Sequence, residues 1–321
     1  MRKALARGEP IPVKDFPRPG LAQPLRVRQV PAPVPRPAFI THARLRRTSP
    51  VAHYAVGAAL EALGDDAAKC GHGALRLGIV FCAMSGCVNY SRRFYDETLK
   101  DPATASPLVF PETVFNSPAS HIAALLGTTA INYTLVGDPG TFLTGLALTA
   151  DWLSAGRVDG CVVVGSEEMD WLTVDAMRLF DRRTISSDGA GALYLKCEPG
   201  ETAVARLEAI TSPHLFSNRN ARAIAAGRAR RELPAGGGPD ELLCDGLVGS
   251  PRADRHEQGA WNDWPGRRLS PKTVVGEGLM AAAAWQCVAA VDALRQNGYA
   301  AANVSVVGIN EQAIAARFVR I

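Results

Sequence analysis

Apolar and polar residues follow one another along the chain in blocks, some with the period of a strand and some with that of a helix. The clearest block lies between residues 134 and 168, where an apolar run, a Gly-Asp-Pro-Gly turn, a helical pattern and a second apolar run succeed one another. A proline at a first helical position and a glycine after the last turn mark the helix boundaries. The predicted elements are a strand, a tight turn, a helix and a strand buried in a parallel sheet, at residues 133–136, 137–140, 142–153 and 161–164.

The rest of the pattern also alternates helices with strands. Ser49 and Pro50 are start signals for one helix, and Asn116, Ser117 and Pro118 open another. The first forty residues differ, because nine of the chain's 22 prolines lie there and favour extended backbone. Helices are predicted at residues 51–63 and 171–180, and strands at residues 75–82 and after the small residues 189–192.

Residues 137–141 form a strand-to-helix turn that we call the elbow. Unpaired N–H groups at a helix N-terminus favour negative charge, so such a position suits a nucleophile. Thr141 is the hydroxyl residue at this helix start, and Asp138 is the carboxylate beside it in sequence. Threonine needs a neighbouring base before it can attack, and aspartate is a weak base at its ordinary pKa. Thr141 with Asp138 is therefore one candidate pair of nucleophile and base.

The composition is that of a globular protein. Of its 321 residues, 47% are hydrophobic and 21% are charged, enough for one large domain or two fused half-domains. Because no run of about eighteen apolar residues and no leader-like start is present, we expect a cytoplasmic protein with no membrane partner. The seven cysteines lack paired spacing and lie mostly in apolar surroundings. We expect them to be reduced and packed, with no metal site and no cofactor.

Charge is distributed unevenly along the chain. Residues 1–47 contain eleven Lys or Arg against Glu9 and Asp15, a net charge of +9, so the remainder carries −5 of the total of +4. A basic face of this kind suits an acidic protein or a nucleic acid, and it equally suits a solvated segment without a partner. We expect no nucleic acid to bind.

Several motifs together resemble the β-ketoacyl synthases (ketosynthases) of the thiolase superfamily. Behind the elbow, Gly156, Asp159, Gly165 and Glu167 fit the family's G-x-x-D-x-x-x-x-G-G-x-E segment. Counting back from this segment without gaps places Pro139 on the family's nucleophilic cysteine, and a one-residue slip places the following glycine there. Neither proline nor glycine can attack a thioester.

Other parts of the chain also resemble family motifs, although the histidines are replaced. In the segment K-x-x-x-G-H-x-x-x-A-A, Lys272 and Gly276 are retained and Glu277 stands in place of the histidine. The family's other histidine motif is matched best at residues 245–250, where Asp245 replaces the histidine. The resemblance implies decarboxylative condensation by one cysteine and two histidines. All three are replaced here, so no intact catalytic set is predicted.

The resemblance implies an α/β fold, the thiolase-like α-β-α-β-α five-layer arrangement of two fused half-domains. We place a basic, Pro-rich N-terminal segment at residues 1–44, an N-terminal half with the elbow at residues 45–200, and a C-terminal half at residues 201–321. Residues 1–8 resemble the end of the family's first helix, and the strand and glycine-rich turn that precede it in the family are missing. We therefore expect an N-terminally truncated member, or one with a compensated deletion.

The replaced residues favour a non-catalytic, chain-length-factor-like subunit, a pseudoenzyme that pairs with an active ketosynthase in fatty-acid, polyketide or aryl-polyene biosynthesis. If the chain is an enzyme, the alternative is an acyltransferase or hydrolase with an altered active site that uses Thr141 and Asp138. A third hypothesis is a homodimer that binds acyl thioesters.

The resemblance also implies partner surfaces. Residues 116–118 correspond to a loop that helps to build the family's dimer interface, and His121 follows on the helix, where a packed or interface role is more typical than a catalytic one. Arg46 and Arg47 match a segment that could dock an acyl carrier protein, and they are equally typical of plain surface charge.

Overall fold

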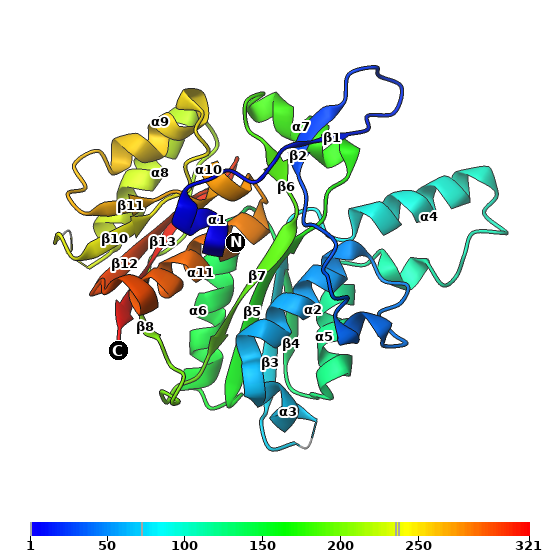
Figure 1. The fold of residues 1–321 in the computed structure, drawn as a ribbon, viewed down its shortest axis with the longest axis horizontal. Coiled ribbons are helices and arrows are strands. Elements are labelled where there is room, and N and C mark those ends of the chain that lie inside the picture. The colour runs from blue at the N-terminus through cyan, green and yellow to red at the C-terminus, as the bar shows by residue number, and fades with distance from the viewer. Residues whose placement is uncertain (1, 72, 235, 237) are drawn as a thin grey trace.

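A four-stranded sheet forms the centre of the first part of the chain. The computed structural model describes residues 2–71, 73–234, 236 and 238–321 (Figure 1). The first two strand pairings across this sheet are parallel, and the third is antiparallel. The strands, in their order across the sheet, are β4 (Asn132–Val136), β3 (Leu77–Ala83), β5 (Gly160–Glu167) and β7 (Gly189–Leu195).

A second large sheet is built from the later part of the chain. Its first two pairings are parallel, and its long strand from residue 312 to residue 320 runs antiparallel to both neighbours. A short strand, β9 (His214–Leu215), pairs with the same long strand. In order across the sheet, the strands are β11 (Arg267–Leu269), β10 (Glu241–Cys244), β12 (Ala301–Val307), β13 (Gln312–Arg320) and β8 (Ala205–Ile210).

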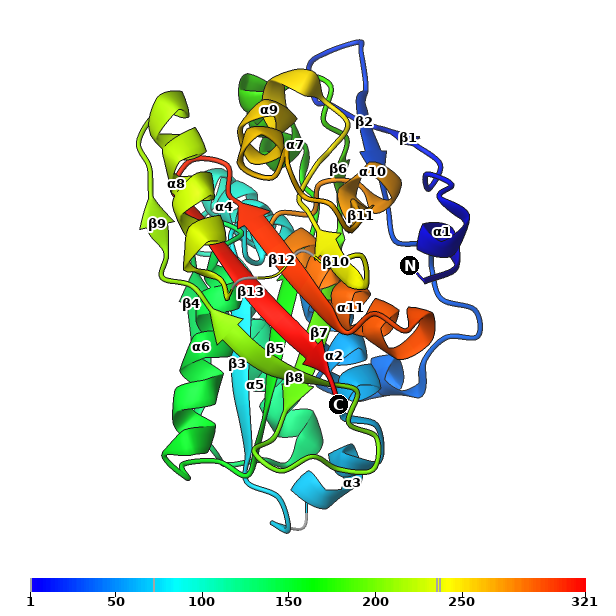
Figure 2. The ribbon, with the colours of Figure 1, turned by 90° about the vertical axis from the view of Figure 1, so that its left-hand side faces the viewer.

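Helices separate and cover the two sheets, which gives five layers (Figures 1 and 2). Between the sheets lie α6 (Thr141–Ser154) and α11 (Met280–Asn297). The outer face of the first sheet is covered by α2 (Pro50–Leu63) and α5 (Ser117–Leu126). On the outer face of the second sheet lie α8 (Arg219–Glu232) and, beside it, α9 (Pro251–Ala260). We call the first sheet with its outer helices the first half of the molecule, and the second sheet with its outer helices the second half.

Strand β3 shows why the first sheet is buried on both faces. Ile79 and Phe81 point into the cluster formed with α2 and α5, whereas Val80 and Cys82 point into the cluster formed with α6 and α11. Successive side chains on a strand point to opposite faces, so a strand between two helical layers must be apolar throughout. All seven residues of β3 are buried.

The N-terminal segment lies against both halves in largely extended conformation, as its prolines predict. Strands β1 (Lys14–Phe16) and β2 (Leu25–Arg28) form a small sheet with β6 (Ser186–Ser187). The remaining helices, 3-10 turns included, are α1 (Arg2–Arg7), η1 (Ala38–Thr41), η2 (Gly64–Asp66), α3 (Ala67–Cys70), α4 (Val88–Lys100), η3 (Phe110–Glu112), α7 (Trp171–Phe180) and α10 (Pro271–Val275).

The elements predicted from the sequence are present with small shifts at their ends. Helix α7 has the predicted residues, and the elbow joins β4 to α6 as expected. One local detail differs: Ser49 precedes α2, but its hydroxyl donates to the buried carboxylate of Glu168 and does not cap the helix. Within the described residues, no helix is long and apolar enough to cross a lipid bilayer.

Candidate functional site

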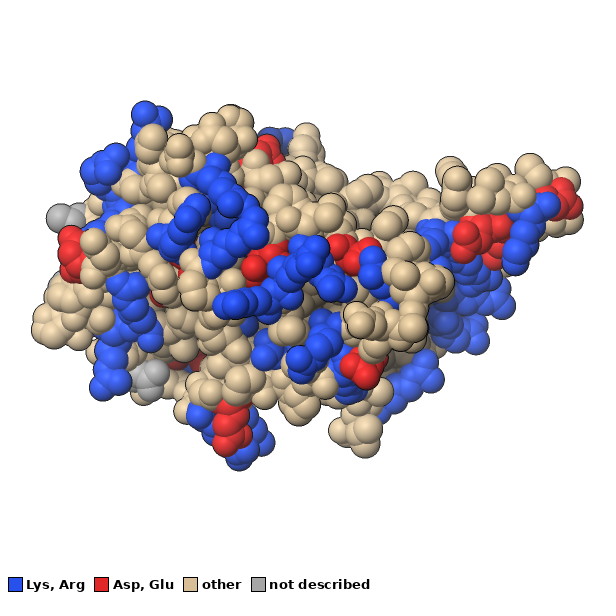
Figure 3. All heavy atoms as spheres, turned by 90° about the horizontal axis from the view of Figure 1, so that it is seen from above, with Lys and Arg blue, Asp and Glu red and all other residues tan. Residues whose placement is uncertain are grey.

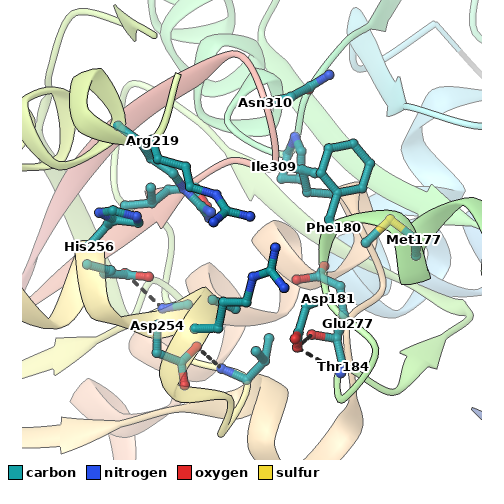
Figure 4. A pocket seen from close by; sticks show the side chains of 18 of the residues that line it. Met177, Phe180, Asp181, Thr184, Arg219, Asp254, His256, Glu277, Ile309 and Asn310 are labelled. Atoms are coloured by element: carbon teal, nitrogen blue, oxygen red, sulfur yellow. Dashed lines mark hydrogen bonds between the residues drawn. The ribbon is translucent and has the colours of Figure 1, made fainter. Parts of the chain in front are cut away.

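A cavity of about 290 Å³ lies between the two halves, at the elbow (Figure 4). The loops that follow β4, β10 and β12 contribute to it, together with the end of α7 and the starts of α8 and α9. Parallel strands that end at the same edge of a sheet bring their loops together, which is where α/β proteins commonly bind ligands. The cavity lining includes Pro139, Met177, Phe180, Asp181, Arg219, Arg222, Gly246, Arg252, Asp254, His256, Glu257, Lys272, Glu277 and Ile309.

The elbow presents Pro139 to this cavity, while the carboxylate of Asp138 is turned toward the loop between β12 and β13. Asp138 is buried, and it accepts hydrogen bonds from the backbone N–H groups of Ile309 at 2.9 Å and Gln312 at 3.3 Å. Burial raises the pKa of Asp138. Residue 308 is glycine, and a Cβ there would lie 1.5 Å from an Asp138 carboxylate oxygen. The close approach of these two segments therefore requires Gly308.

The two residues of the predicted alternative nucleophile and base face different partners. The Thr141 hydroxyl accepts a hydrogen bond from the Gln312 side-chain amide at 3.1 Å, and the Asp138 carboxylate is bound to backbone N–H groups. Among the residues that the structure describes, neither Thr141 nor Asp138 lines the cavity.

Lys272 and Glu277, which the motif comparison predicts as a retained lysine and a replaced histidine, form a buried ion pair in the cavity wall. Their Nζ and Oε2 atoms lie 2.8 Å apart, and the two side chains are only 4% and 6% exposed. The other carboxylate oxygen of Glu277 accepts from the backbone N–H of Leu279 at 2.8 Å. Both oxygens are thus held by donors, and Glu277 contributes no hydrogen-bond donor while it is ionised.

Asp245 points away from the cavity, although it immediately follows β10. Its carboxylate accepts from the Ser270 hydroxyl at 2.6 Å and lies 3.8 Å from the Arg268 guanidinium, and burial raises its pKa. The neighbouring Gly246 lines the cavity instead and donates its N–H to Glu257 at 2.9 Å. Burial and the charge of Asp245 raise the pKa of Glu257 to about 7.

None of the cavity-lining residues in the described part of the chain is a cysteine. Six of the seven cysteines are buried, and Cys197 is exposed after β7. Cys82 lies next to the elbow, with its Sγ 3.9 Å from the backbone carbonyl oxygen of Thr141, and burial raises the pKa of that thiol well above its usual range. Because the nucleophilic form of cysteine is the thiolate, this burial keeps Cys82 unreactive.

The sequence pattern revealed only part of the cavity's cationic side. Arg219 and Arg222 are recognisable as part of a basic helix, but Arg252 and His256 come from another helix some thirty residues later. Burial and the charge of Arg255 lower the pKa of His256. A three-residue spacing does place Arg219 and Arg222 on one side of α8, which is the sequence signal that was available.

The predicted interface residues lie where the arm formed by α4 and η3 joins α5. Asn116 is exposed, whereas Ser117 and Pro118 are buried within the chain. His121 Nε2 and the Ser117 hydroxyl both contact the Glu112 carboxylate, at 3.0 and 2.8 Å. This cluster fixes η3 on the start of α5.

Arg46 and Arg47, the predicted docking residues, are exposed just before α2. Their guanidinium groups are therefore open to solvent and to a partner.

Known structures show which fold this is. No protein-family model matches the sequence, and no curated protein matches it. The structure is similar to a β-ketoacyl synthase from Burkholderia phymatum STM815, with a TM-score of 0.75, 15% identity, and 100% of this chain and 94% of that chain covered. It is also similar to a chain in the structure of the ketosynthase ApeO in complex with its chain length factor ApeC from Xenorhabdus doucetiae (TM-score 0.76, 14% identity, 99% and 92% covered).

A third similar structure is the ishigamide ketosynthase/chain length factor, with a TM-score of 0.72, 19% identity, and 96% of this chain and 91% of that chain covered. These likenesses extend over almost the whole of each chain. The protein therefore has the ketosynthase fold that its motifs predicted.

Proposed function

We propose that this chain is a non-catalytic ketosynthase-like subunit that pairs with an active ketosynthase, as a chain length factor does. The observation that carries the proposal is the elbow, which presents Pro139 to a cavity whose described lining contains no cysteine. Condensation on an enzyme-bound acyl group needs a nucleophile at this place. It also needs donors for a developing negative charge, and the ion-paired Glu277 supplies none.

Exposed apolar side chains on the first half support a partner role. The arm formed by α4 and η3 projects from the body of the molecule (Figure 1), and Tyr95, Leu99 and Phe110 on it are 62%, 67% and 54% exposed. Strand β4 is an outer strand of its sheet, and its Tyr133 is 54% exposed. Clustered exposed apolar groups and an open strand edge are features that a partner protein commonly covers.

The partner that fits this proposal is a ketosynthase with an intact cysteine, and the acyl group would be delivered by an acyl carrier protein. Two of the similar structures are described as pairs of a ketosynthase and a chain length factor. The exposed Arg46 and Arg47 are candidates for the carrier contact, since such cationic side chains attract an acidic surface.

The proposed lack of catalysis is tested by intact-protein mass spectrometry. The protein is incubated with a panel of acyl-carrier thioesters and with malonyl-carrier protein, and the release of carbon dioxide is followed. We expect no covalent adduct and no carbon dioxide. An acyl adduct would overturn the proposal, and its loss in Thr141→Ala would establish the alternative in which Thr141 is the nucleophile.

The pairing is tested by co-expression with candidate ketosynthases of the source cell that keep the cysteine, followed by size-exclusion chromatography with light scattering. We expect a heterodimer with the unaltered chain, and loss of the heterodimer when Leu99 and Phe110 are both replaced by Glu. The matched control is Leu215→Glu on β9 of the second half, where the side chain is 70% exposed. Elution of the two unaltered proteins as separate species would refute the pairing.

A further inference from the structure

Strand β7 is the last strand of the first sheet. One of its edges pairs with β5, and among the described strands none pairs with the other, which we call the open edge. Helices α2 and α11 pack on the two faces of β7, and Figure 1 shows the strand running between them. An outer edge presents a row of N–H and C=O groups to which a further strand can bind.

One hydrogen bond shows which residues of β7 face the open edge. The Ala190 carbonyl accepts from the indole N–H of Trp285 at 2.9 Å, and a carbonyl directed at β5 inside the sheet would be out of reach of this side chain. In an antiparallel ladder, residues that face the neighbouring strand alternate with residues that face away from it. Ala192 and Tyr194 therefore also direct their N–H and C=O groups at the open edge. Within the described part of the chain, these four backbone groups have no hydrogen-bond partner.

The second sheet shows how such an edge is covered. Strand β13 has the position there that β7 has in the first sheet, because each is the fourth strand and runs antiparallel to the third. The outer edge of β13 pairs antiparallel with β8. Seven of the nine residues of β13 are buried, whereas only Gly189 and Gly191 are buried among the seven residues of β7. The position of β7 is thus that of an inner strand, and its exposure is that of an edge.

The sequence of β7 is also that of an inner strand. Residues 189–195 include neither a charged residue nor a proline. Edge strands commonly use charged side chains and proline to avoid pairing with other chains. Strand β8, which is an outer strand of its own sheet, does include the charged residues Arg206 and Glu208. Nothing in the side chains of β7 therefore opposes the addition of a strand.

The N-terminal segment passes close to β7 without pairing with it. Val30 lies against Gly189, the first residue of the strand. Residues 31–36 are exposed, and prolines occupy positions 31, 33, 35 and 37. Because alternate residues of a strand face the same edge, these prolines would leave one whole edge of the segment without N–H donors. The segment is therefore poorly suited to be the neighbour of β7.

We propose that the open edge of β7 binds one extended segment of a second protein, which joins the first sheet as an antiparallel fifth strand. The backbone groups of Ala192 and Tyr194 pair with the segment, as in other cases of strand addition. Side chains of the segment extend two rows, one with the partly buried Leu193 and Leu195 on the α11 side and one with Ala192 and Tyr194 on the α2 side. The segment is therefore uncharged, with apolar residues on both faces.

This surface differs from the one in the proposed pairing with a ketosynthase. The pairing uses the arm and β4, and β4 and β7 are opposite outer strands of the first sheet. We choose a single segment over a second copy of this chain because the internal counterpart, β8, is a single strand. Failure of the pairing and failure of the strand addition would thus be observed separately.

The probe is a fluorescein-labelled peptide of residues 203–210 with Arg206→Thr and Glu208→Thr, since this segment contains the fifth strand of the second sheet. An uncharged probe is needed because Lys and Arg side chains gather on the face shown in Figure 3 and would attract a charged peptide. Fluorescence anisotropy with the full chain should show saturable binding. The same peptide with Leu207→Pro should bind at least about tenfold more weakly. Absence of binding, or equal binding of the two peptides, would overturn the proposal.

Amide hydrogen exchange, followed by NMR, locates the binding and detects other occupants. In the free protein the N–H groups of Ala192 and Tyr194 should exchange faster than those of Leu193 and Leu195, and the peptide should slow the first two by at least about tenfold. Slow exchange of the first two at every protein concentration would show that the chain covers this edge itself. Slow exchange only at high protein concentration would show that a second copy covers it. Either result would overturn the proposal.

Matched variants test the edge directly. Ala192→Pro removes an N–H group directed away from β5, and Ala192→Lys places a charge on the strand; each should weaken peptide binding by about tenfold or more. Ala223→Lys adds the same charge on the exposed side of α8 and should leave binding unchanged, as should Leu99→Glu with Phe110→Glu on the arm. Equal weakening by Ala192→Lys and Ala223→Lys would overturn the site. If Ala192→Pro does not fold, Ala192→Lys with its control still decides.

Discussion

The two halves of the molecule have the same strand order but different chemistry. Across the first sheet the order is β4-β3-β5-β7, and across the second it is β11-β10-β12-β13-β8. Read in chain order, the first four positions correspond one to one, and in both sheets the fourth strand is antiparallel to the third. The two sheets thus share a topology that residue identities do not reveal. Among the described strands, only the second sheet has a fifth member of this order, β8.

The halves differ in what they contribute to the cavity. In the first half, the backbone of the elbow places Pro139 in the cavity wall. The elbow is held there by Asp138, which accepts a hydrogen bond from the loop after β12. The second half supplies most of the charged groups, from Arg219 and Arg252 to the Lys272–Glu277 pair, and the first half adds Asp181. Because most of the charge comes from the second half, substitutions in the two halves should have different effects.

The largest effect is expected for Lys272→Met in the second half. This change leaves the Glu277 carboxylate buried without its cation, and the cost in unfolding free energy should be about 3–5 kcal/mol. Pro139→Ala in the first half leaves no buried charge without its partner, so it should lower the unfolding free energy by less than about 1 kcal/mol. Urea denaturation measures both. Equal losses of unfolding free energy in the two variants would contradict the expected difference between the halves. Adding Glu277→Gln to Lys272→Met should recover stability.

A smaller effect is expected where the halves meet. A Cβ on Gly165 of β5 would lie 2.7 Å from the Met280 carbonyl oxygen and 3.0 Å from Ala284 Cβ on α11. Gly165→Ala should therefore push α11 off the first sheet and lower the unfolding free energy by about 1–3 kcal/mol. Thermal unfolding followed by circular dichroism tests this. An unchanged midpoint would mean that α11 can move away from the first sheet without a loss of stability.

The pH dependence of stability should reveal one buried glutamate in each half. Burial raises the pKa of Glu167 to about 8 and, with the charge of Asp245, that of Glu257 to about 7. Between about pH 4.5 and these values the folded protein binds more protons than the unfolded chain, so stability falls as pH rises, by up to about 1.4 kcal/mol per pH unit for each group.

Glu167→Gln should flatten this slope up to about pH 8, and Glu257→Gln only up to about pH 7. Denaturation at pH 5, 6, 7 and 8 measures the difference. The same slope in both variants and in the unaltered protein would show that these two carboxylates are ionised in the folded protein throughout.

The smallest effect is expected on an outer helix of the second half. Gly227 lies within α8, and an added Cβ would meet only the mobile end of the Arg231 side chain, at 3.3 Å. Alanine forms helix better than glycine, so Gly227→Ala should stabilise the protein by about 0.5–1 kcal/mol. A loss of stability in the same melting experiment would mean that α8 is packed as tightly as α11.

The sequence predicts the elements and the elbow well, because these depend on local signals. Glycine, proline and apolar spacing between residues 133 and 164 are enough to place β4, α6 and β5. The composition of the cavity depends on packing between distant segments and could not be predicted. Arg252 and Arg219 line the same cavity because α9 packs on α8, and Asp245 turns to Ser270 while its neighbour Gly246 faces the cavity.

The contact between Asp138 and the loop after β12 has a consequence for any attempt to make this elbow reactive. The N–H group of Ile309 is a donor of the kind that could stabilise a developing oxyanion, and a resident anion from the chain itself already occupies it. A thiol introduced at residue 139 would therefore sit beside a filled anion site. We therefore expect that reactivity of a thiol at this position would require two coordinated changes, one to add the nucleophile and one to free the N–H donor from Asp138.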